Sequence, residues 1–295
     1  CMFFIADWHS LTTHPKPENI RNSARTILCE YLACGINPEI APIYVQSDVK
    51  QVLELYLYLN MNAYLGELER VTSFKDKARK QPDNVNAGLL TYPTLMAADI
   101  LMHKADKVPV GKDQEQNMEM ARLFARRFNR IYNVDYFKEP ESFYFNAKAV
   151  KVPGLDGSGK MGKSEGNCIY LCDSEEVIRK KVMRAVTDAG PTMLNQEKPE
   201  VIQNLFTLME LVSDKQTYDY FNDQYNNMAI RYGDMKKQLA QDINAFCAPI
   251  REKIVAYQND DEYLAKVLRL GAERASERAE KTLEDVRQII GFRRI

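Results

Sequence analysis

The sequence has almost no excess of either charge sign, because 40 lysines and arginines balance 41 aspartates and glutamates among 295 residues. This balance excludes a global electrostatic field that would draw the protein onto nucleic acid or an anionic membrane. Long apolar runs are also lacking, since none approaches the roughly 20 residues that a membrane-spanning helix needs, and no signal peptide is visible. We therefore expect a cytoplasmic protein that makes no membrane contact.

Ligands for a metal ion are equally scarce. The six cysteines contain no CxxC pair, and three histidines could join them. Cys29 with Cys34, and Cys168 with Cys172, fall in apolar segments, which is typical of small core residues. We expect reduced thiols and no structural metal.

The remaining composition indicates a folded protein with a sizeable core. Hydrophobic residues make up 45% of the chain and charged residues 27%, which excludes intrinsic disorder. The length of 295 residues corresponds to about two domains.

Strands and helices alternate over the first 130 residues. Apolar runs predict short buried strands at 1–6, 40–46 and 108–110, and the segments between and after them predict helices at 17–34, 49–64, 92–104 and 113–129. Gly35 is the expected carboxyl cap of the first helix, and Asp113 the expected N-cap of the last. Such alternation is typical of a parallel α/β sheet, in which ligands bind beyond the carboxyl ends of the strands.

The pattern changes beyond residue 168. One strand-like piece at 169–172 is followed by helices that begin near residues 174, 199, 216, 232 and 261, the last of which ends before Gly291. We therefore expect an α/β domain at 1–168 and an all-helical domain at 169–295.

The glycine-rich segment 157–164 can be interpreted in three ways. It matches the G-x-x-x-x-G-K-[ST] phosphate loop letter for letter. That loop must follow a buried strand and open into a helix, whereas residues 151–156 are poor in strand formers and Gly166 with Asn167 stands where the helix should begin. The second interpretation is a mobile loop whose Lys160 and Lys163 stabilise a reacting triphosphate. The third is a solvated linker.

Five segments, in order along the chain, resemble one family. Residues 160–164 (KMGKS) resemble the KMSKS signature of class I aminoacyl-tRNA synthetases, and 110–114 (VGKDQ) resembles the G-x-D-Q motif of their tyrosine and tryptophan branch. Residues 66–70 (GELER), 74–77 (FKDK) and 89–100 (LLTYPTLMAADI) are similar to tryptophanyl-tRNA synthetases of the bacterial type. Any one motif is weak, but five in this order are specific.

Two features depart from the family pattern. Its HIGH-like signature, which holds the adenine end of ATP, would lie upstream of Cys1, so we expect a longer natural chain with about 35–40 further residues. Gly162 stands where the loop signature usually has serine, which removes one hydroxyl and leaves both lysines.

The resemblance implies an activity, a Rossmann-like catalytic domain and a helical domain that reads the tRNA anticodon. L-tryptophan would be ligated to its tRNA through a tryptophanyl-adenylate, with ATP entering as its Mg²⁺ complex. The family is homodimeric, and the apolar stretch 52–64 is the candidate interface, although ordinary core is the alternative.

Tyr92, Met96 and Asp99 share one helix face at i, i+4 and i+7. Without the resemblance, a lone carboxylate there is more often an edge-of-core residue. With it, the face becomes the floor of an amino-acid pocket in which Asp99 accepts the indole N–H. The remaining residues implied for tryptophan are His9, Val108, Val110 and Gln114.

The resemblance also implies a nucleotide site. Lys77 would join Lys160 and Lys163 as the catalytic cations, although a solvated charge run is the alternative for Lys77. The residues implied for ATP are Gly111, Lys112, Asp113, Lys151, Val152, Lys160, Met161, Gly162, Lys163 and Ser164. A basic stripe could meet RNA or could be salt-linked helix surface, and it consists of Arg122, Arg126, Arg127 and Arg130.

Three alternatives stay open. A tyrosyl-tRNA synthetase is disfavoured because Met96 stands where that family typically has glutamine. A non-catalytic synthetase-like fragment is motivated by the missing HIGH-like segment. A P-loop kinase comes last.

Overall fold

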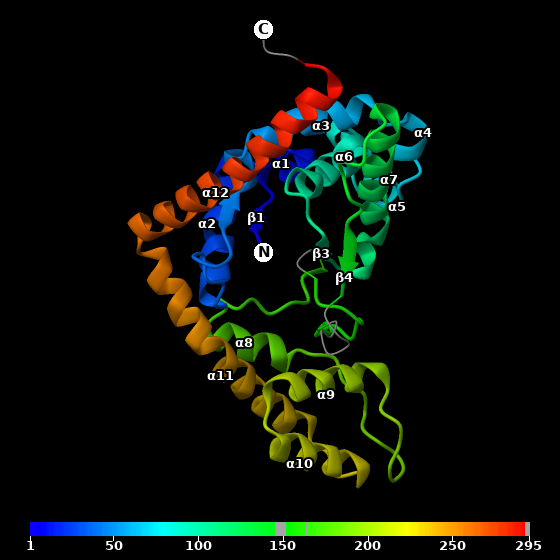
Figure 1. The fold of residues 1–295 in the computed structure, drawn as a ribbon. Helices are drawn as coiled ribbons and strands as arrows, with labels where there is room; N and C mark the ends of the chain where they lie inside the picture. The colour runs from blue at the N-terminus through cyan, green and yellow to red at the C-terminus, as the bar shows by residue number, and fades with distance from the viewer. Residues whose placement is uncertain (145–151, 163–164, 293–295) are drawn as a thin grey trace. The chain divides into compact units, whose positions relative to one another are not determined.

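The computed structural model describes residues 1–144, 152–162 and 165–292 (Figure 1). Contacts divide the chain into two compact units, the first formed by 1–146 together with 260–295 and the second by 147–259. This division differs from the expected single boundary after residue 168. The carboxyl-terminal helix, placed by its sequence position in the helical domain, packs instead on a strand of the first unit.

In the first unit, strand β1 (Phe3–Ile5) pairs in parallel with β2 (Ile43–Val45). The connection runs through α1 (Asp7–Ser10), a 3₁₀ turn and α2 (Pro17–Ala33). Both strands and the long helix were predicted. Gly35 adopts φ +96° just past the helix end, where glycine is favoured for its left-handed conformation.

A second parallel pair joins β3 (Lys107–Pro109) to β4 (Glu141–Phe143), with α7 (Glu115–Tyr132) between them. The predicted strand at 108–110 is confirmed within one residue, whereas β4 was not predicted. The expected N-cap role of Asp113 was wrong, because Asp113 lies in a 3₁₀ turn (Lys112–Gln114) that precedes α7. Parallel strands joined through helices confirm the α/β class of this unit.

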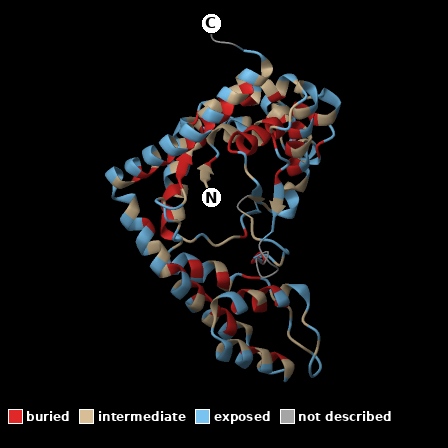
Figure 2. Ribbon diagram, viewed as in Figure 1, coloured by how far each residue is buried: buried red, intermediate tan, exposed pale blue. Residues whose placement is uncertain are grey.

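Four helices complete the first unit's amino-terminal part: α3 (Gln51–Met61), α4 (Leu65–Leu68), α5 (Thr72–Lys80) and α6 (Ala87–Met102). Helix α6 begins five residues before the predicted start, because the Asn86 side chain caps it by accepting from the Leu89 N–H at 3.0 Å. Pro93 lies inside the helix. From Tyr92 onward α6 is largely buried in the core (Figure 2).

Helix α12 (Asp261–Ile290) packs on β2, α3 and α6. Gly271 makes the close approach to β2: a Cβ there would lie 1.9 Å from the Ile43 carbonyl oxygen. At that distance the backbone of the helix or of the strand would have to shift, which costs stability.

Gly271→Ala is therefore expected to lower the free energy of unfolding by about 1–3 kcal/mol, the usual cost of overpacking. Thermal or urea denaturation measures the change. Gly233→Ala is the matched control, since nothing lies within 4 Å of a Cβ at that helix position. Equal stability of the two variants would contradict the close approach of α12 to β2.

The second unit has its own core, built from α8 (Glu175–Met183), α9 (Glu200–Val212), α10 (Lys215–Asn226) and α11 (Tyr232–Gln258). All four helix starts were predicted within one residue. The strand expected at 169–172 was wrong, because the described residues 165–174 contain no strand. Within the described part of the chain, no helix is long and apolar enough to span a membrane.

Candidate active site

A buried carboxylate lies where the two strands of the first parallel pair end. His9, in α1, follows β1, and Gln46 follows β2. The Asp99 carboxylate from α6 meets both: His9 Nε2 lies 3.1 Å from Oδ2, and Gln46 Nε2 donates to Oδ1 at 2.9 Å and to Oδ2 at 2.8 Å. The carboxyl ends of parallel strands thus deliver two polar side chains to one acid on the facing helix.

Two opposing effects act on the pKa of the Asp99 carboxyl. Its side chain is 4% exposed, and burial raises the pKa of its carboxyl, while the hydrogen bonds from His9 and Gln46 act in the opposite direction. An ionised carboxylate only accepts hydrogen bonds, so its chemistry would suit a ligand group that donates one.

Tyr92 of α6 and Lys77 of α5 extend the cluster. The Lys77 ammonium lies 3.8 Å from the centroid of the Tyr92 ring, and the His9 ring meets the same tyrosine edge-on with centroids 6.3 Å apart. The Tyr92 hydroxyl donates to Ser73 Oγ. Burial lowers the pKa of Lys77. The structure therefore brings together four of the predicted residues: His9, Lys77, Tyr92 and Asp99.

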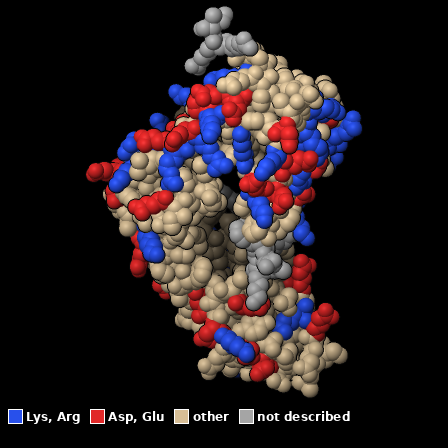
Figure 3. All heavy atoms as spheres, in the orientation of Figure 1, with Lys and Arg blue, Asp and Glu red and all other residues tan. Residues whose placement is uncertain are grey.

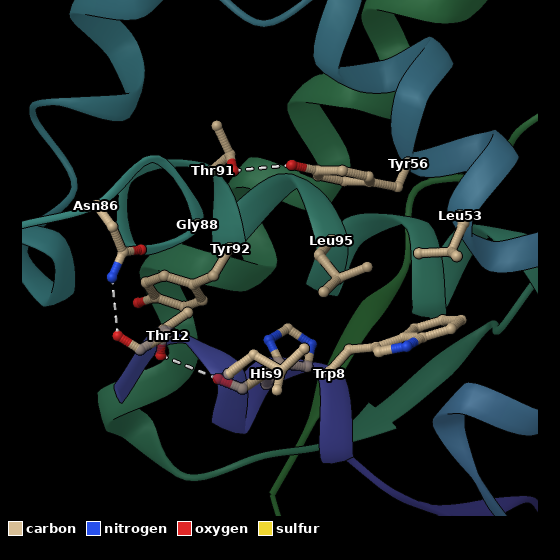
Figure 4. A pocket seen from close by; sticks show the side chains of 11 residues that line it. Trp8, His9, Thr12, Leu53, Tyr56, Asn86, Gly88, Thr91, Tyr92 and Leu95 are labelled. Carbon is tan, nitrogen blue, oxygen red and sulfur yellow. Dashed lines mark hydrogen bonds between the residues drawn. The ribbon is translucent and has the colours of Figure 1, made fainter. Parts of the chain in front are cut away.

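A cavity of about 170 Å³ opens beside His9 and Tyr92 (Figure 4). Asn86 Nδ2 donates to the Thr12 carbonyl at 3.0 Å, and the hydroxyls of Tyr56 and Thr91 are 2.8 Å apart. Besides His9 and Tyr92, the lining consists of residues that were not predicted: Trp8, Leu11, Thr12, Leu53, Tyr56, Asn86, Gly88, Thr91 and Leu95. Trp8 is next to the predicted His9 in the sequence. Gly88, Thr91 and Leu95 lie within one turn of Tyr92 on the same helix face, and this helical spacing could have predicted them.

Other residues predicted for the tryptophan pocket do not line this cavity. Met96, Val108 and Val110 are partly buried against the core cluster that contains α6. Gln114 donates to Asp113 Oδ2 at 3.0 Å and accepts from Asn117 at 2.9 Å.

The segment before α7 is crowded at Gly111. A Cβ there would lie 2.4 Å from Asp113 Oδ1, so a larger residue would displace this carboxylate. Lys112 is exposed in the same turn.

The glycine-rich segment 157–164, called the lysine loop below, belongs to the second unit. The side-chain amide of one buried residue, Asn167, organises its described part. Asn167 Oδ1 accepts from the Gly162 N–H at 2.8 Å, and its Nδ2 donates to Asp156 at 2.9 Å and to the Lys160 carbonyl at 3.1 Å. Hydrogen bonds from Ser158 and Asn167 lower the pKa of Asp156 to about 2. The Met161 N–H donates to the Val152 carbonyl at 2.6 Å.

This arrangement excludes one of the three interpretations of the loop. Described residues 165–174 form no α-helix, so the P-loop alternative was wrong. The Lys160 side chain is exposed. Lys151, Lys163 and Ser164 were also predicted for the site and lie outside the described residues.

Three of the four arginines of the basic stripe on α7 form ion pairs. Arg122 pairs with Glu115 and Glu119, Arg126 pairs with Glu119 and Glu139, and Arg127 with Glu67. Figure 3 shows acidic and basic side chains intermingled on the visible face. The described residues hold no group of three or more His, Cys, Asp or Glu that could bind a metal ion.

Comparison with known proteins identifies the class. Residues 1–248 match the family model of the class I tRNA synthetases (W and Y). The chain therefore belongs to the class I tRNA synthetases of the tryptophan and tyrosine branch, as the five motifs indicated.

The relatives narrow this class to the tryptophan enzymes. The chain is 71% identical to the tryptophan–tRNA ligase of Porphyromonas gingivalis, and the match covers 99% of this chain and 90% of that relative. It is 38% identical to that of Rickettsia conorii over 99% and 89% of the two chains. The crystal structure of Campylobacter jejuni tryptophanyl-tRNA synthetase, complexed with ADP and tryptophan, superposes with a TM-score of 0.86 at 33% identity, covering 98% of this chain and 88% of that one. Within the class, the chain belongs to the tryptophan–tRNA ligase family.

Proposed function

We propose that this protein ligates L-tryptophan to its tRNA in an ATP-dependent reaction that passes through tryptophanyl-adenylate. The observation that carries the proposal is the buried Asp99, an acid held by His9 and Gln46 on the helix face that also carries Tyr92. An acceptor beside an aromatic side chain suits the indole ring, which offers one N–H on an apolar body. Tryptophan–tRNA ligase relatives support the same assignment.

The chemistry needs no side-chain nucleophile. The tryptophan carboxylate attacks the α-phosphate of ATP and pyrophosphate leaves. The adenylate then transfers its acyl group to a ribose hydroxyl at the tRNA 3′ end, and AMP leaves. ATP enters as its Mg²⁺ complex, so the metal comes with the substrate. Catalysis is then positioning together with charge stabilisation, for which the chain offers Lys77, Lys160 and Lys163.

Residue roles follow from this proposal. Asp99 accepts the indole N–H, and His9, Tyr92, Met96 and Gln114 complete the amino-acid site with Val108 and Val110. Gly111, Lys112 and Asp113 serve the ribose, because the glycine leaves room for the acid beside it. The loop from Lys151 and Val152 to Ser164 serves the phosphates, and the second unit contacts tRNA.

Tryptophan-dependent ATP–pyrophosphate exchange tests the first step, and charging of tRNA(Trp) tests the second. We expect exchange with tryptophan and little with tyrosine. Exchange that responds to tyrosine instead would overturn the proposal, and binding without exchange would favour the non-catalytic alternative.

A homodimer in the cytoplasm is the proposed working form. Helix α3 presents an exposed apolar stripe at i, i+4 and i+8, with Leu53 44%, Leu57 47% and Met61 74% exposed. Its other face, with Leu55 and Leu59, is buried in the core, so the stretch 52–64 serves both core and surface. A second copy that docks on the stripe would remove it from water.

Met61→Glu is expected to weaken this dimer by at least about 10-fold, because association would bury an unpaired charge. Sedimentation equilibrium of variant and parent measures the dissociation constant. Val255→Glu is the control, since Val255 is 51% exposed on a helix of the second unit. A dimer of parental strength in Met61→Glu would place the interface elsewhere.

A further inference from the structure

Gln46 was not among the predicted site residues, yet it makes the closest contacts to Asp99. It follows β2 in a 3₁₀ turn (Gln46–Asp48) and is 1% exposed. Its Nε2 donates to both oxygens of the Asp99 carboxylate, at 2.9 and 2.8 Å. The opposite amide orientation would set the Gln46 oxygen against two carboxylate oxygens, so the contact itself fixes which end faces Asp99.

The other groups around Asp99 carry charge or can gain it. His9 and Asp7 face it from α1, the histidine as a hydrogen-bond partner and the aspartate as a nearby like charge. Tyr44 on β2 is also within electrostatic range. The Gln46 amide, in contrast, has no titratable proton and is a donor at every pH. Gln46 is thus the constant donor in a cluster of titratable groups.

We propose that Gln46 is a positioning residue for amino-acid selection, which holds the Asp99 carboxylate as a fixed acceptor for the indole N–H. The proposal deepens the proposed function and rests on it. The contacts from Gln46 Nε2 to both oxygens restrain the position of the carboxylate, and the His9 contact to Oδ2 restrains its rotation. The remaining acceptor capacity of the oxygens stays available to a ligand. Gln46 Oε1 has no partner among the described residues.

Loss of this donor has a defined direction with pH. Without Gln46, burial raises the pKa of Asp99 further, so the carboxyl takes up its proton at a higher pH. A protonated Asp99 can donate a hydrogen bond, and its O–H can then face the indole N–H as a second donor. Tryptophan recognition should therefore weaken as the pH falls, and it should begin to weaken at a higher pH in the variant than in the parent.

The experiment compares Gln46→Met with the parent in ATP–pyrophosphate exchange between pH 6 and 8.5. The amino acids are tryptophan and an analogue whose ring N–H is replaced by sulfur. We expect KM for tryptophan to rise about 10-fold at pH 8.5 and more at pH 6, with KM for the analogue changing less than about 3-fold. In an Asp99→Asn background, Gln46→Met should add little, because the group through which it acts is gone.

Gln51→Met is the matched control, since Gln51 Nε2 donates at 2.9 Å to Glu280, a carboxylate of the same unit far along the chain. It should leave the ratio of the two KM values and its pH dependence at parental values. If Gln46→Met does not fold, Gln46→Asn, which keeps the amide on a shorter side chain, decides by the same readout.

Two results separate the possible failures. Equal KM changes for tryptophan and the analogue at every pH, with an active parent, would overturn the role of Gln46 alone. A parent without tryptophan-dependent exchange would overturn the proposed function and this inference with it.

Discussion

Replacement of Asp99 by alanine is expected to lower kcat/KM for tryptophan by about 100–1000-fold, and much less for the sulfur analogue. Ring area alone separates aromatic amino acids weakly, by about 1–3 kcal/mol per methylene-sized group. A buried acceptor discriminates more strongly, because a ligand without the N–H leaves it unpaired. Activation kinetics with both amino acids measure the ratio.

Asp99→Asn is the graded control for this prediction. Its carbonyl can still accept a hydrogen bond, so the loss should be smaller than for alanine. Thermal denaturation checks the fold, since Asp99→Ala also removes a partner from His9 and from Gln46. If Asp99→Ala leaves the ratio between tryptophan and the analogue unchanged, Asp99 does not read the indole.

Lys160→Ala and Lys163→Ala should each slow adenylate formation by roughly 10–1000-fold while changing tryptophan affinity little. The physical reason is that a cation which stabilises charge developing on the triphosphate acts mainly in the transition state. Pre-steady-state exchange separates the chemical step from binding. For Lys160, the hydrogen bond from Asn167 to its carbonyl holds the backbone while the side chain stays exposed.

Lys180→Ala is the matched control, because Lys180 is an exposed lysine on α8 of the same unit. It should retain parental rates. Silent Lys160→Ala together with inactive Lys163→Ala would assign the phosphate contact to Lys163 alone, whereas two silent variants would leave the loop as a solvated linker.

Local signals in the sequence predicted most of the helices. Ser174 caps α8 through a hydrogen bond to the Val177 N–H, and Gly291 ends α12 in the left-handed conformation. Both positions were recognised because capping depends on residues within one turn of the helix end. Helix α6 was predicted from residue 92, but the Asn86 side chain caps it and the helix begins five residues earlier, at Ala87.

Contacts between distant segments were harder to predict. The resemblance named Asp99, His9 and Lys77, but nothing local to Gln46 indicates a carboxylate 53 residues further on. The packing of α12 on β2 likewise depends on the close contact between Gly271 and Ile43, which are 228 positions apart. Helical periodicity does not predict such a contact. Residues that act through such contacts need coordinates to be found.

The return of α12 also affects the order in which the protein can be completed during synthesis. Gly271 leaves the ribosome 228 residues after Ile43, a delay of roughly 10–45 s at typical rates of translation. Throughout that interval α12 cannot cover β2, although residues 147–259, which have a core of their own, are already complete. A chain that stalls before residue 260 would therefore contain all of the second unit but lack the α12 part of the first.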